Sequence, residues 1–566
     1  MTADELARAI AASGVRDTAR VAEAARAVAD WLARAPADEV ADGLAAAADP
    51  GAALDQLARL LPAAEAPPAP GRVAPLLRLL GGSPALAGAL VAEGAAWPAL
   101  VAAVHEVPAR GPDAQRAALA AAGAAGPLSR ADLQAALRRH RRRELVRIGG
   151  RDLLGLASVE DTVRELSALA EGVIDAAVAS VRARLAAEWG EALVPGEGRR
   201  AAFVVLGMGK LGGEELNYSS DVDLVYVYER DGEQAAGRTL GQFFSRLAEE
   251  VTRALGEVTG DGLVFRVDLR LRPGGGEGPV AVSLPAALSY YEAWGQTWER
   301  AAWLKARAVG GDRALGERLI AELMPFVYRR YLDFGTLEDL EAMKRRVDAS
   351  LRGPQAARDV KLGRGGIREV EFFVQAQQLV HGGKDPRLQV RSTLGALAAL
   401  AATGYVEPAL AVSLAAAYRF LRDVEHKLQI VQERRTQSVP SDPDALLALA
   451  RRLGFRGAGA AAEFEAARAR HGAVVRGAFA ALFHGAEEER RREAEPELAL
   501  LIDELDQPER ALWRLGRLGF RDLESAYREL RLLRDGPPHA PASARRRPAL
   551  VRLAPALLTE IGRAHV

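Results

Sequence analysis

The sequence predicts a predominantly helical α+β protein in which one small mixed β-sheet is embedded between helical domains. Residues 1–66 are rich in Ala and Leu, contain few β-branched residues and carry charges at the spacing of helix surfaces, and helical sequence continues after a break to about residue 145. Residues 201–271 contain three short β-rich runs, and the helical pattern returns from about residue 284. Because 566 residues are too many for one hydrophobic core, we expect several domains.

The composition excludes several classes of function. Lys+Arg and Asp+Glu both number 75, so no global charge draws the chain to nucleic acid or to an anionic membrane. The absence of Cys excludes disulfides, thiolate metal sites and cysteine catalysis. Residues 1–10 lack the apolar core of a signal peptide, and no uncharged apolar run reaches about 18 residues. We therefore expect a cytoplasmic protein that binds neither nucleic acid nor membrane.

The region before the sheet is predicted to be helical, and we place this N-terminal helical region at 1–150. Residues 1–66 are predicted to form stacked helices, which end at a Pro-rich break at 66–72. Ser158, followed three residues later by Asp161, matches a capping box and predicts the start of a long helix.

The sheet is predicted from three runs within a domain that we place at 151–315. The runs 201–207, 221–228 and 263–271 have the composition of strands. An amphipathic helix, at roughly 237–256, separates the second run from the third.

A helical bundle is predicted at 316–485, and the clearest pattern lies in residues 412–433. Apolar side chains recur there at alternating steps of three and four, which predicts one buried helix face. These side chains are Leu414, Ala417, Leu421, Val424, Leu428 and Val431. A charged junction at 485–500 and a last helical piece at 501–533 precede a Pro/Arg-rich break, and we assign 486–566 to a further helical region.

The segment that indicates chemistry is GMGKLGGEELNYSSDVDLVYVY, which begins at Gly207. Its four glycines permit positive φ and close backbone approach, so backbone N–H groups can point at phosphate oxygens. They are Gly207, Gly209, Gly212 and Gly213. Lys210 can add a positive charge at the same place.

Three carboxylates follow the glycine turn. Asp221 and Asp223 lie two residues apart on a predicted strand, so both project from one face. If the third predicted strand pairs beside it, Asp268 completes the set. Arg270 and Arg272 would share its face and reach phosphate. Side-by-side carboxylates suit Mg²⁺, which prefers them together with substrate phosphate oxygens.

The expected chemistry is displacement at phosphorus. Two metal ions a few Å apart would stabilise the attacking and leaving oxygens, while Arg, Lys and loop amides neutralise the developing charge. The glycine turn alone is weak evidence for this chemistry, because it lacks the Ser or Thr of a Walker motif. The Asp-x-Asp pair alone is also weak evidence, because such a pair usually marks a turn or a solvated edge. Their joint order resembles the nucleotidyltransferase superfamily of DNA polymerase β. The resemblance implies a polymerase-β-like nucleotidyltransferase domain at 151–315.

Three longer motifs begin at Gly207, Phe265 and Lys361. They read GMGKLGGEELNYSSDVDLVYVYE, FRVDLRLRPGGGEGPVAVSLPAALSYYEAWGQTWERAAWLKARAVGGD and KLGRGGIREVEFFVQAQQLVHGG. Over about residues 75–480 the chain resembles the glutamine synthetase adenylyltransferase/adenylyl-removing enzyme family. That family has two homologous nucleotidyltransferase halves joined by a regulatory helical region. Its C-terminal half transfers AMP from ATP to a tyrosine of glutamine synthetase, and its N-terminal half removes the AMP with orthophosphate, releasing ADP.

The chain holds one copy of the glycine/Asp-x-Asp motif, and the sequence around it resembles the N-terminal half of the family. This resemblance implies Mg²⁺-dependent removal of AMP. ADP or ATP and orthophosphate would be substrates or products, and glutamine synthetase and the PII signal protein would be partners. Residues 486–566 would begin the regulatory region, with the second half missing. The final IGRAHV is one translation of a common sequencing adapter, which indicates an open reading frame that runs off a contig end; a shortened paralogue is the alternative.

The resemblance also implies roles for individual residues. Asp221 and Asp223 would bind metal with Asp268 as the third ligand. The residues expected to hold phosphate are Gly212, Gly213, Ser220, Lys210, Arg270 and Arg272.

Two further polar groups are left open. The first lies in a predicted helix, WERAAWLKAR, and belongs either to the site or to a solvated helix face. It comprises Glu299, Arg300, Lys305 and Arg307. The second group lies at spacings of three and four along one predicted helix, so its side chains share one face. This face either lines the cleft of the active site or is an ordinary polar face. It comprises Arg368, Glu371, Gln375 and Gln378.

Three rival functions are considered. A PII uridylyltransferase has a similar core but also carries a His-Asp hydrolase domain, and no His in this sequence is followed by Asp. A non-catalytic scaffold would be favoured by loss of a metal carboxylate, but all three are present. Adenylyl transfer from ATP is the third rival, because the metal site serves either direction.

Overall fold

The structure is a computed structural model that describes residues 18–63, 67–124, 126–233, 237–329 and 358–493, followed by 501, 504–517, 520 and 522–535. The chain divides into two units, residues 1–476 and 477–566. The finer domain boundaries expected from the sequence stay a prediction. The expected helical start at 1–17 and the break after residue 535 lie outside the described residues.

The first unit contains a mixed sheet of five strands. Its strands are β1 (Phe203–Gly207), β2 (Val222–Tyr228), β3 (Val267–Asp268), β4 (Ala281–Ser283) and β5 (Arg307–Gly311). The order is β3-β2-β1-β5, and β4 also pairs with β2. β1 is antiparallel to β2 and to β5, whereas β2 is parallel to β3 and to β4. The predicted α+β class with a small mixed sheet is confirmed.

Both faces of β1 are buried, which explains why its sequence is an uninterrupted apolar run. On one face, the ring of Phe203 stacks on Phe244 of α13 (Leu240–Gly256), with ring centroids 5.4 Å apart. On the other face, Gly316 of α16 (Arg313–Val327) lies so close that an added Cβ would meet Val204 and Ala308. Helices therefore cover the sheet on both sides.

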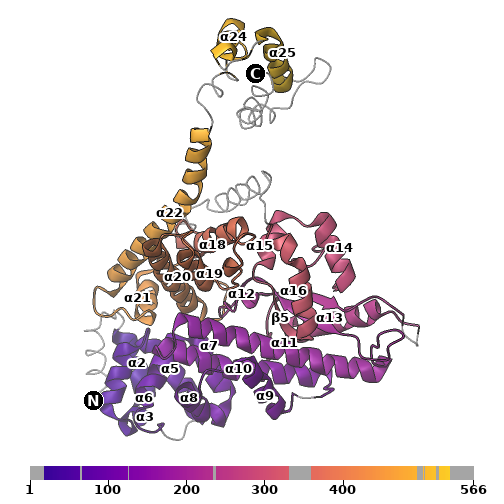
Figure 1. Ribbon diagram of the computed structural model, residues 1–566. Coiled ribbons are helices and arrows are strands. Elements are labelled where there is room, and N and C mark those ends of the chain that lie inside the picture. The colour runs from indigo at the N-terminus through magenta and orange to yellow at the C-terminus, as the bar shows by residue number, and fades with distance from the viewer. Residues whose placement is uncertain are drawn as a thin grey trace. The chain divides into compact units, whose positions relative to one another are not determined.

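Helices precede the sheet, as the sequence predicts. Their bounds are α2 Thr18–Ala27, α3 Ala29–Arg34, α4 Ala37–Ala46, α5 Pro50–Leu60, α6 Val73–Gly82, α7 Pro84–Ala92, α8 Trp97–Glu106, α9 Pro112–Leu119, α10 Arg130–Leu154 and α11 Val159–Trp189. α10 and α11 run side by side (Figure 1). The capping box of α11 is confirmed, since the Asp161 N–H donates to Ser158 Oγ and the Ser158 N–H donates to Asp161 Oδ2.

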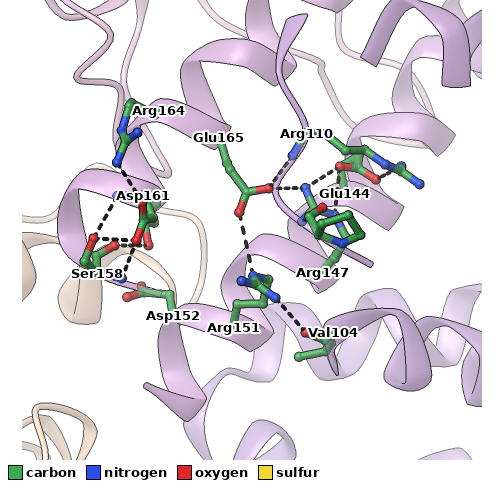
Figure 2. A network of polar contacts seen from close by, with 12 residues as sticks. Val104, Arg110, Glu144, Arg147, Arg151, Asp152, Ser158, Asp161, Arg164 and Glu165 are labelled. Carbon is green, nitrogen blue, oxygen red and sulfur yellow. Dashed lines mark hydrogen bonds and ion pairs between the residues drawn. The ribbon is translucent and has the colours of Figure 1, made fainter. Parts of the chain in front are cut away.

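Buried charges join α10 to α11. The guanidinium of Arg147 lies 2.8 Å from Glu144 and 2.5 Å from Glu165, and all three side chains are almost fully buried. Figure 2 shows the two carboxylates on either side of Arg147, with Arg110 completing the group around Glu144. Burial alone would raise the pKa of Glu144, but hydrogen bonds from Arg147 hold it below its usual value. The two long helices are therefore held in one register by paired charges.

Helices also follow and interrupt the sheet. Their bounds are α12 Gly209–Gly212, α13 Leu240–Gly256, α14 Leu284–Trp294, α15 Thr297–Trp303, α16 Arg313–Val327, α18 Ile367–His381, α19 Thr393–Ala402, α20 Pro408–Gln429, α21 Pro443–Arg452 and α22 Ala460–Glu493. The predicted stripe on α20 is buried at Leu414, Ala417, Leu421, Val424 and Leu428. In the second unit, α24 (Pro508–Arg517) and α25 (Leu523–Asp535) pack against each other.

The third predicted strand is wrong in length. It was expected over 263–271, but β3 contains only Val267 and Asp268. The chain turns after β3 because the Asp268 carboxylate accepts the Arg270 N–H and the Arg272 N–H donates to the Leu269 carbonyl. The expected single face carrying Asp268, Arg270 and Arg272 therefore does not form.

The predicted helix WERAAWLKAR is confirmed in its first six residues and wrong in its last four. α15 ends at Trp303, and Arg307 begins β5. Glu299 and Arg300 are buried, so they do not form a solvated helix face. Neither β4 nor β5 was predicted, because each has only a few β-branched residues between helices.

Among the described residues, no single helix is long and apolar enough to cross a membrane. α6 and α7 reach the required length and apolarity only together, and the chain bends by 116° between them.

Candidate functional site

A cavity of about 260 Å³ lies where the sheet meets α18 and α20. Its walls are polar and combine four carboxylates with five cationic side chains. The lining residues are Gly209, Lys210, Asn217, Ser219, Ser220, Asp221, Asp223, Asp268, Arg270, Lys305, Lys361, Glu371, Gln375, Gln429, Arg435 and Gln437. All three predicted aspartates are among them.

The pairing of β2 with β3 brings the aspartates together. Asp223 lies directly opposite Asp268 in parallel register. Burial first, and the carboxylates of Asp268 and Asp221 second, raise the pKa of Asp223 to about 6. The site therefore concentrates negative charge at one wall of the cavity.

Guanidinium groups hold the other two carboxylates. Asp221 accepts hydrogen bonds from Arg266 Nε at 2.7 Å and from Arg435 at 2.8 Å. Arg270 lies 2.5 Å from Asp268 and holds the pKa of that carboxyl below its usual value. Oxygen donors of this kind fit Mg²⁺ chemically. In the described part of the chain, however, no three His, Asp or Glu side chains are already grouped to hold a metal ion.

The glycine that approaches the carboxylates is Gly209. Its φ is +51°, and an added Cβ would lie 3.0 Å from Asp223 Oδ2. The preceding Met208 N–H donates to the Asp223 carbonyl at 2.9 Å, which fixes the turn against β2. The turn therefore needs glycine at this position for both backbone conformation and space.

Gly212 and Gly213 do not line the cavity, contrary to the expected phosphate cradle. A Cβ at Gly212 would overlap the carbonyl oxygen of Lys305, and one at Gly213 would lie 3.1 Å from Lys305 Cδ. These glycines instead allow α12 to pack against the segment that carries Lys305 into the cavity.

Lys210 and Ser220 line the cavity, and their role in holding phosphate stays a prediction. Lys210 Nζ lies 3.3 Å from Glu425 Oε1. Burial lowers the pKa of Lys210 to about 8, although Glu425 opposes the effect. Ser220 Oγ donates to Asn217 Oδ1 at 2.6 Å. Both side chains are therefore positioned by neighbours in the cavity wall.

The structure does not support a phosphate contact for Arg272. It lies outside the cavity lining, and its guanidinium donates to backbone carbonyls of its own loop. The accepting residues are Leu269, Gly276, Gly278 and Pro279. Arg272 therefore organises the turn that ends β3.

The second polar row left open by the sequence divides between two roles. Glu371 and Gln375 line the cavity. The Gln378 amide instead donates to the carbonyls of Leu388 and Val390 at 2.8 and 2.7 Å, and Arg368 is not part of the lining.

Several lining residues were not predicted. They are Asn217, Ser219, Lys361, Gln429, Arg435 and Gln437. Lys305 was named only as part of the predicted helix WERAAWLKAR, and it lies beyond the end of α15. Its Nζ lies 2.5 Å from Glu215 and donates to Thr393 Oγ1 at 3.0 Å. A cation with buried partners from distant segments has no local sequence signal.

A chain of buried charges ties the cavity to α20. The guanidinium of Arg422 lies 2.6 Å from Glu425 and also donates to the carbonyl of Glu215 at 2.5 Å. Burial alone would raise the pKa of Glu425, but Lys210 and Arg422 outweigh it and hold the pKa well below its usual value. The positions of both Lys210 and Lys305 therefore depend on the helical bundle.

Comparison with known proteins identifies the family. A family model for glutamate-ammonia ligase adenylyltransferase matches residues 73–321, and one for GlnD PII-uridylyltransferase matches residues 340–483. Relatives from Pseudomonas aeruginosa, Nitrosococcus oceani and Xanthobacter autotrophicus are 42%, 41% and 42% identical to this chain. Each is named bifunctional glutamine synthetase adenylyltransferase/adenylyl-removing enzyme. This chain belongs to the glutamine synthetase adenylyltransferase family.

The matches cover 71%, 76% and 78% of this chain but 41%, 45% and 45% of the relatives. The chain thus spans less than half the length of the family members it matches. The two matched segments meet at the cavity, because residues 73–321 supply the aspartates and residues 340–483 supply the opposite wall.

Proposed function

We propose that this chain removes AMP from an adenylylated tyrosine of glutamine synthetase by Mg²⁺-dependent phosphorolysis, releasing ADP. The observation that carries the proposal is the parallel register of Asp223 and Asp268 beside Asp221, all on one cavity wall. Family membership supports chemistry on glutamine synthetase, since the relatives carry both adenylyltransferase and adenylyl-removing in their names.

The chemistry is an in-line displacement at phosphorus. An oxygen of orthophosphate attacks the phosphorus of the bound AMP, the bond to the tyrosine oxygen breaks, and the proton carried by phosphate passes to that oxygen. When bound, Mg²⁺ would be held by Asp221, Asp223 and Asp268 and would neutralise the phosphoryl oxygens. Lys305 and Lys361 face the same cavity and add positive charge for the transition state.

The direction of the reaction and the partners rest on resemblance. The segment GPVAVSLPAALSYYEAWGQTWERAAWLKAR resembles the AMP-removing half of the family. The match of residues 340–483 to a PII-uridylyltransferase model supports PII as a regulatory partner.

The decisive experiment incubates the chain with adenylylated glutamine synthetase, orthophosphate and Mg²⁺ and measures ADP. Asp223→Asn should abolish ADP release, whereas Glu322→Gln, which removes an exposed carboxylate from α16, should not. Release of AMP instead of ADP would identify water as the attacking group. Transfer of labelled AMP from ATP to unmodified glutamine synthetase at a comparable rate would reverse the proposed direction.

The match of residues 340–483 favours PII uridylylation as the second candidate function. It is tested by incubating the chain with PII and labelled UTP. Label on PII, without ADP release from adenylylated glutamine synthetase, would replace the proposed function with this one.

A further inference from the structure

A second cavity, of about 330 Å³, adjoins the catalytic one. The two share Ser219 and Ser220 as lining residues. α7, α10 and the loop that leads into β3 form its other walls. Its charged lining residues are Arg138, Arg141, Arg142, Arg266, Asp261 and Glu433. The lining thus holds four guanidinium groups and two carboxylates, and two further carboxylates, Glu93 and Asp221, pair with Arg142 and Arg266 from outside it.

Two of these arginines are committed to the protein. Arg138 donates to backbone carbonyls, including those of Gly262 at 2.8 Å and Gln134 at 3.0 Å. Arg142 pairs with Glu93 at 3.0 Å and with Asp261 at 3.3 Å. Both therefore shape the walls of the cavity and are not free to receive a ligand.

Arg141 has an unused donor. Its guanidinium lies 2.8 Å from Glu433 and 5.6 Å from the ring centroid of Phe265, and its side chain is only 15% exposed. Its Nε is buried with no hydrogen-bond partner. A buried N–H without an acceptor destabilises the folded protein unless a ligand supplies an acceptor.

The backbone at Glu433 supports a built site. Its φ is +49°, in the left-handed region that non-glycine residues rarely adopt. The structure thus holds a strained residue whose carboxylate pairs with Arg141 at the cavity wall. Strain of this kind clusters at ligand-binding positions.

Arg266 links the two cavities. It lines the second cavity, yet its Nε donates to Asp221 at 2.7 Å, and its guanidinium also donates to the Ser219 carbonyl. An anion in the second cavity competes with Asp221 for this guanidinium. Its binding therefore removes one of the two guanidinium partners of Asp221 and leaves Arg435 as the other.

We propose that the second cavity binds a phosphate group through Arg141 and Arg266, and that this binding releases Asp221 from Arg266 and so makes it a better metal ligand in the catalytic site. Planar guanidinium groups match phosphate oxygens in charge and geometry. The release of Asp221 for metal rests on the proposed function, whereas phosphate binding itself does not. By linkage, phosphate and a divalent cation raise each other's affinity by the same factor.

The test is calorimetric titration of the whole chain, without metal, with inorganic phosphate, AMP and adenosine as separate probes. Arg141→Gln should weaken binding of phosphate or AMP at least tenfold. Arg143→Gln is the matched control, because Arg143 carries the same charge on α10 but pairs with Glu93 outside the cavity. Glu433→Gln removes a competing carboxylate and should tighten binding several-fold, which keeps the test valid if Arg141→Gln fails to fold.

The probes separate the two sources of phosphate. Phosphate that binds as tightly as AMP points to free orthophosphate, whereas AMP that binds much more tightly points to a nucleotide. Adenosine binding equal to AMP would overturn the proposal, because phosphate would then not be the recognised group. Binding that survives Arg141→Gln but is lost in Lys361→Gln would also overturn it by locating the anion in the catalytic cavity.

The link to Asp221 has its own readout. Titration with Mn²⁺, followed by electron paramagnetic resonance, should show tighter Mn²⁺ binding when phosphate is present. Arg266→Gln should abolish that difference. Mn²⁺ affinity that is independent of phosphate in the unmodified chain would refute the link, whatever the enzymatic activity.

Discussion

Replacing Asp223 by Asn should stabilise the metal-free protein while abolishing its activity. Burial and two neighbouring carboxylates raise the pKa of Asp223 from 3.8 to about 6. At about 1.36 kcal/mol for each pKa unit, the charged form destabilises the folded state by up to about 3 kcal/mol above pH 6. Asn has nearly the same shape but no charge, so we expect a gain of about 1–3 kcal/mol at pH 8.

The effect of Asp223 on the stability of the folded protein depends on pH, and its sign follows from the direction of the pKa shift. The folded-state pKa of Asp223 lies above its unfolded value, so the folded state binds the proton more tightly. The stability that this proton contributes is fully present below about pH 4 and is lost as pH rises through about 6. The advantage of Asp223→Asn should therefore be about 1–1.5 kcal/mol larger at pH 8 than at pH 5.

Scanning calorimetry in EDTA at pH 5 and pH 8 measures this difference. Glu322→Gln is the control for loss of one negative charge, since Glu322 pairs only at the surface with Arg318. An Asp223→Asn variant that is no more stable than the unmodified chain at pH 8 would refute the reasoning. So would an advantage that does not change with pH.

Three further outcomes are expected. Glu425→Gln leaves two buried cations without their carboxylate and should lower the free energy of unfolding in urea by about 3–5 kcal/mol. The control Glu160→Gln, at a surface ion pair, should lower it by less than about 1 kcal/mol. Equal losses in the two variants would contradict the buried network. Gly209→Ala places a Cβ against Asp223 and should lower ADP release at least tenfold, whereas Gly404→Ala, also at positive φ but in open space, should not. EDTA should abolish ADP release and excess Mg²⁺ should restore it; activity that persists in EDTA would exclude the metal assignment.

Local patterns in the sequence predicted much of the fold. The capping box at Ser158, the buried stripe of α20 and the strands β1 and β2 depend on neighbours within a few residues, so their signals are local. The third predicted strand failed because the Asp268 side chain ends it by accepting the Arg270 N–H. A composition typical of strands does not reveal such a turn.

Roles within the site were harder to predict than its location. The glycine turn, followed by Asp221 and Asp223 and later by Asp268, was enough to locate the cavity. A site that brings carboxylates close together needs these residue types in this order. It did not separate Gly209, which touches Asp223, from Gly212, which packs against Lys305. Both are glycines in one turn, and only the packing of Lys305, just before β5, distinguishes them.

The sequence by itself determined the carboxylate motif, the helical periodicity and the family resemblance. Only the tertiary structure decided which cations face the carboxylates. Lys210 meets Glu425, and Arg435 meets Asp221, across more than 200 residues of chain. In the sequence each is an ordinary charge beside ordinary neighbours. A buried charge is favourable only when folding brings its partner within contact distance, so its role is a property of the fold.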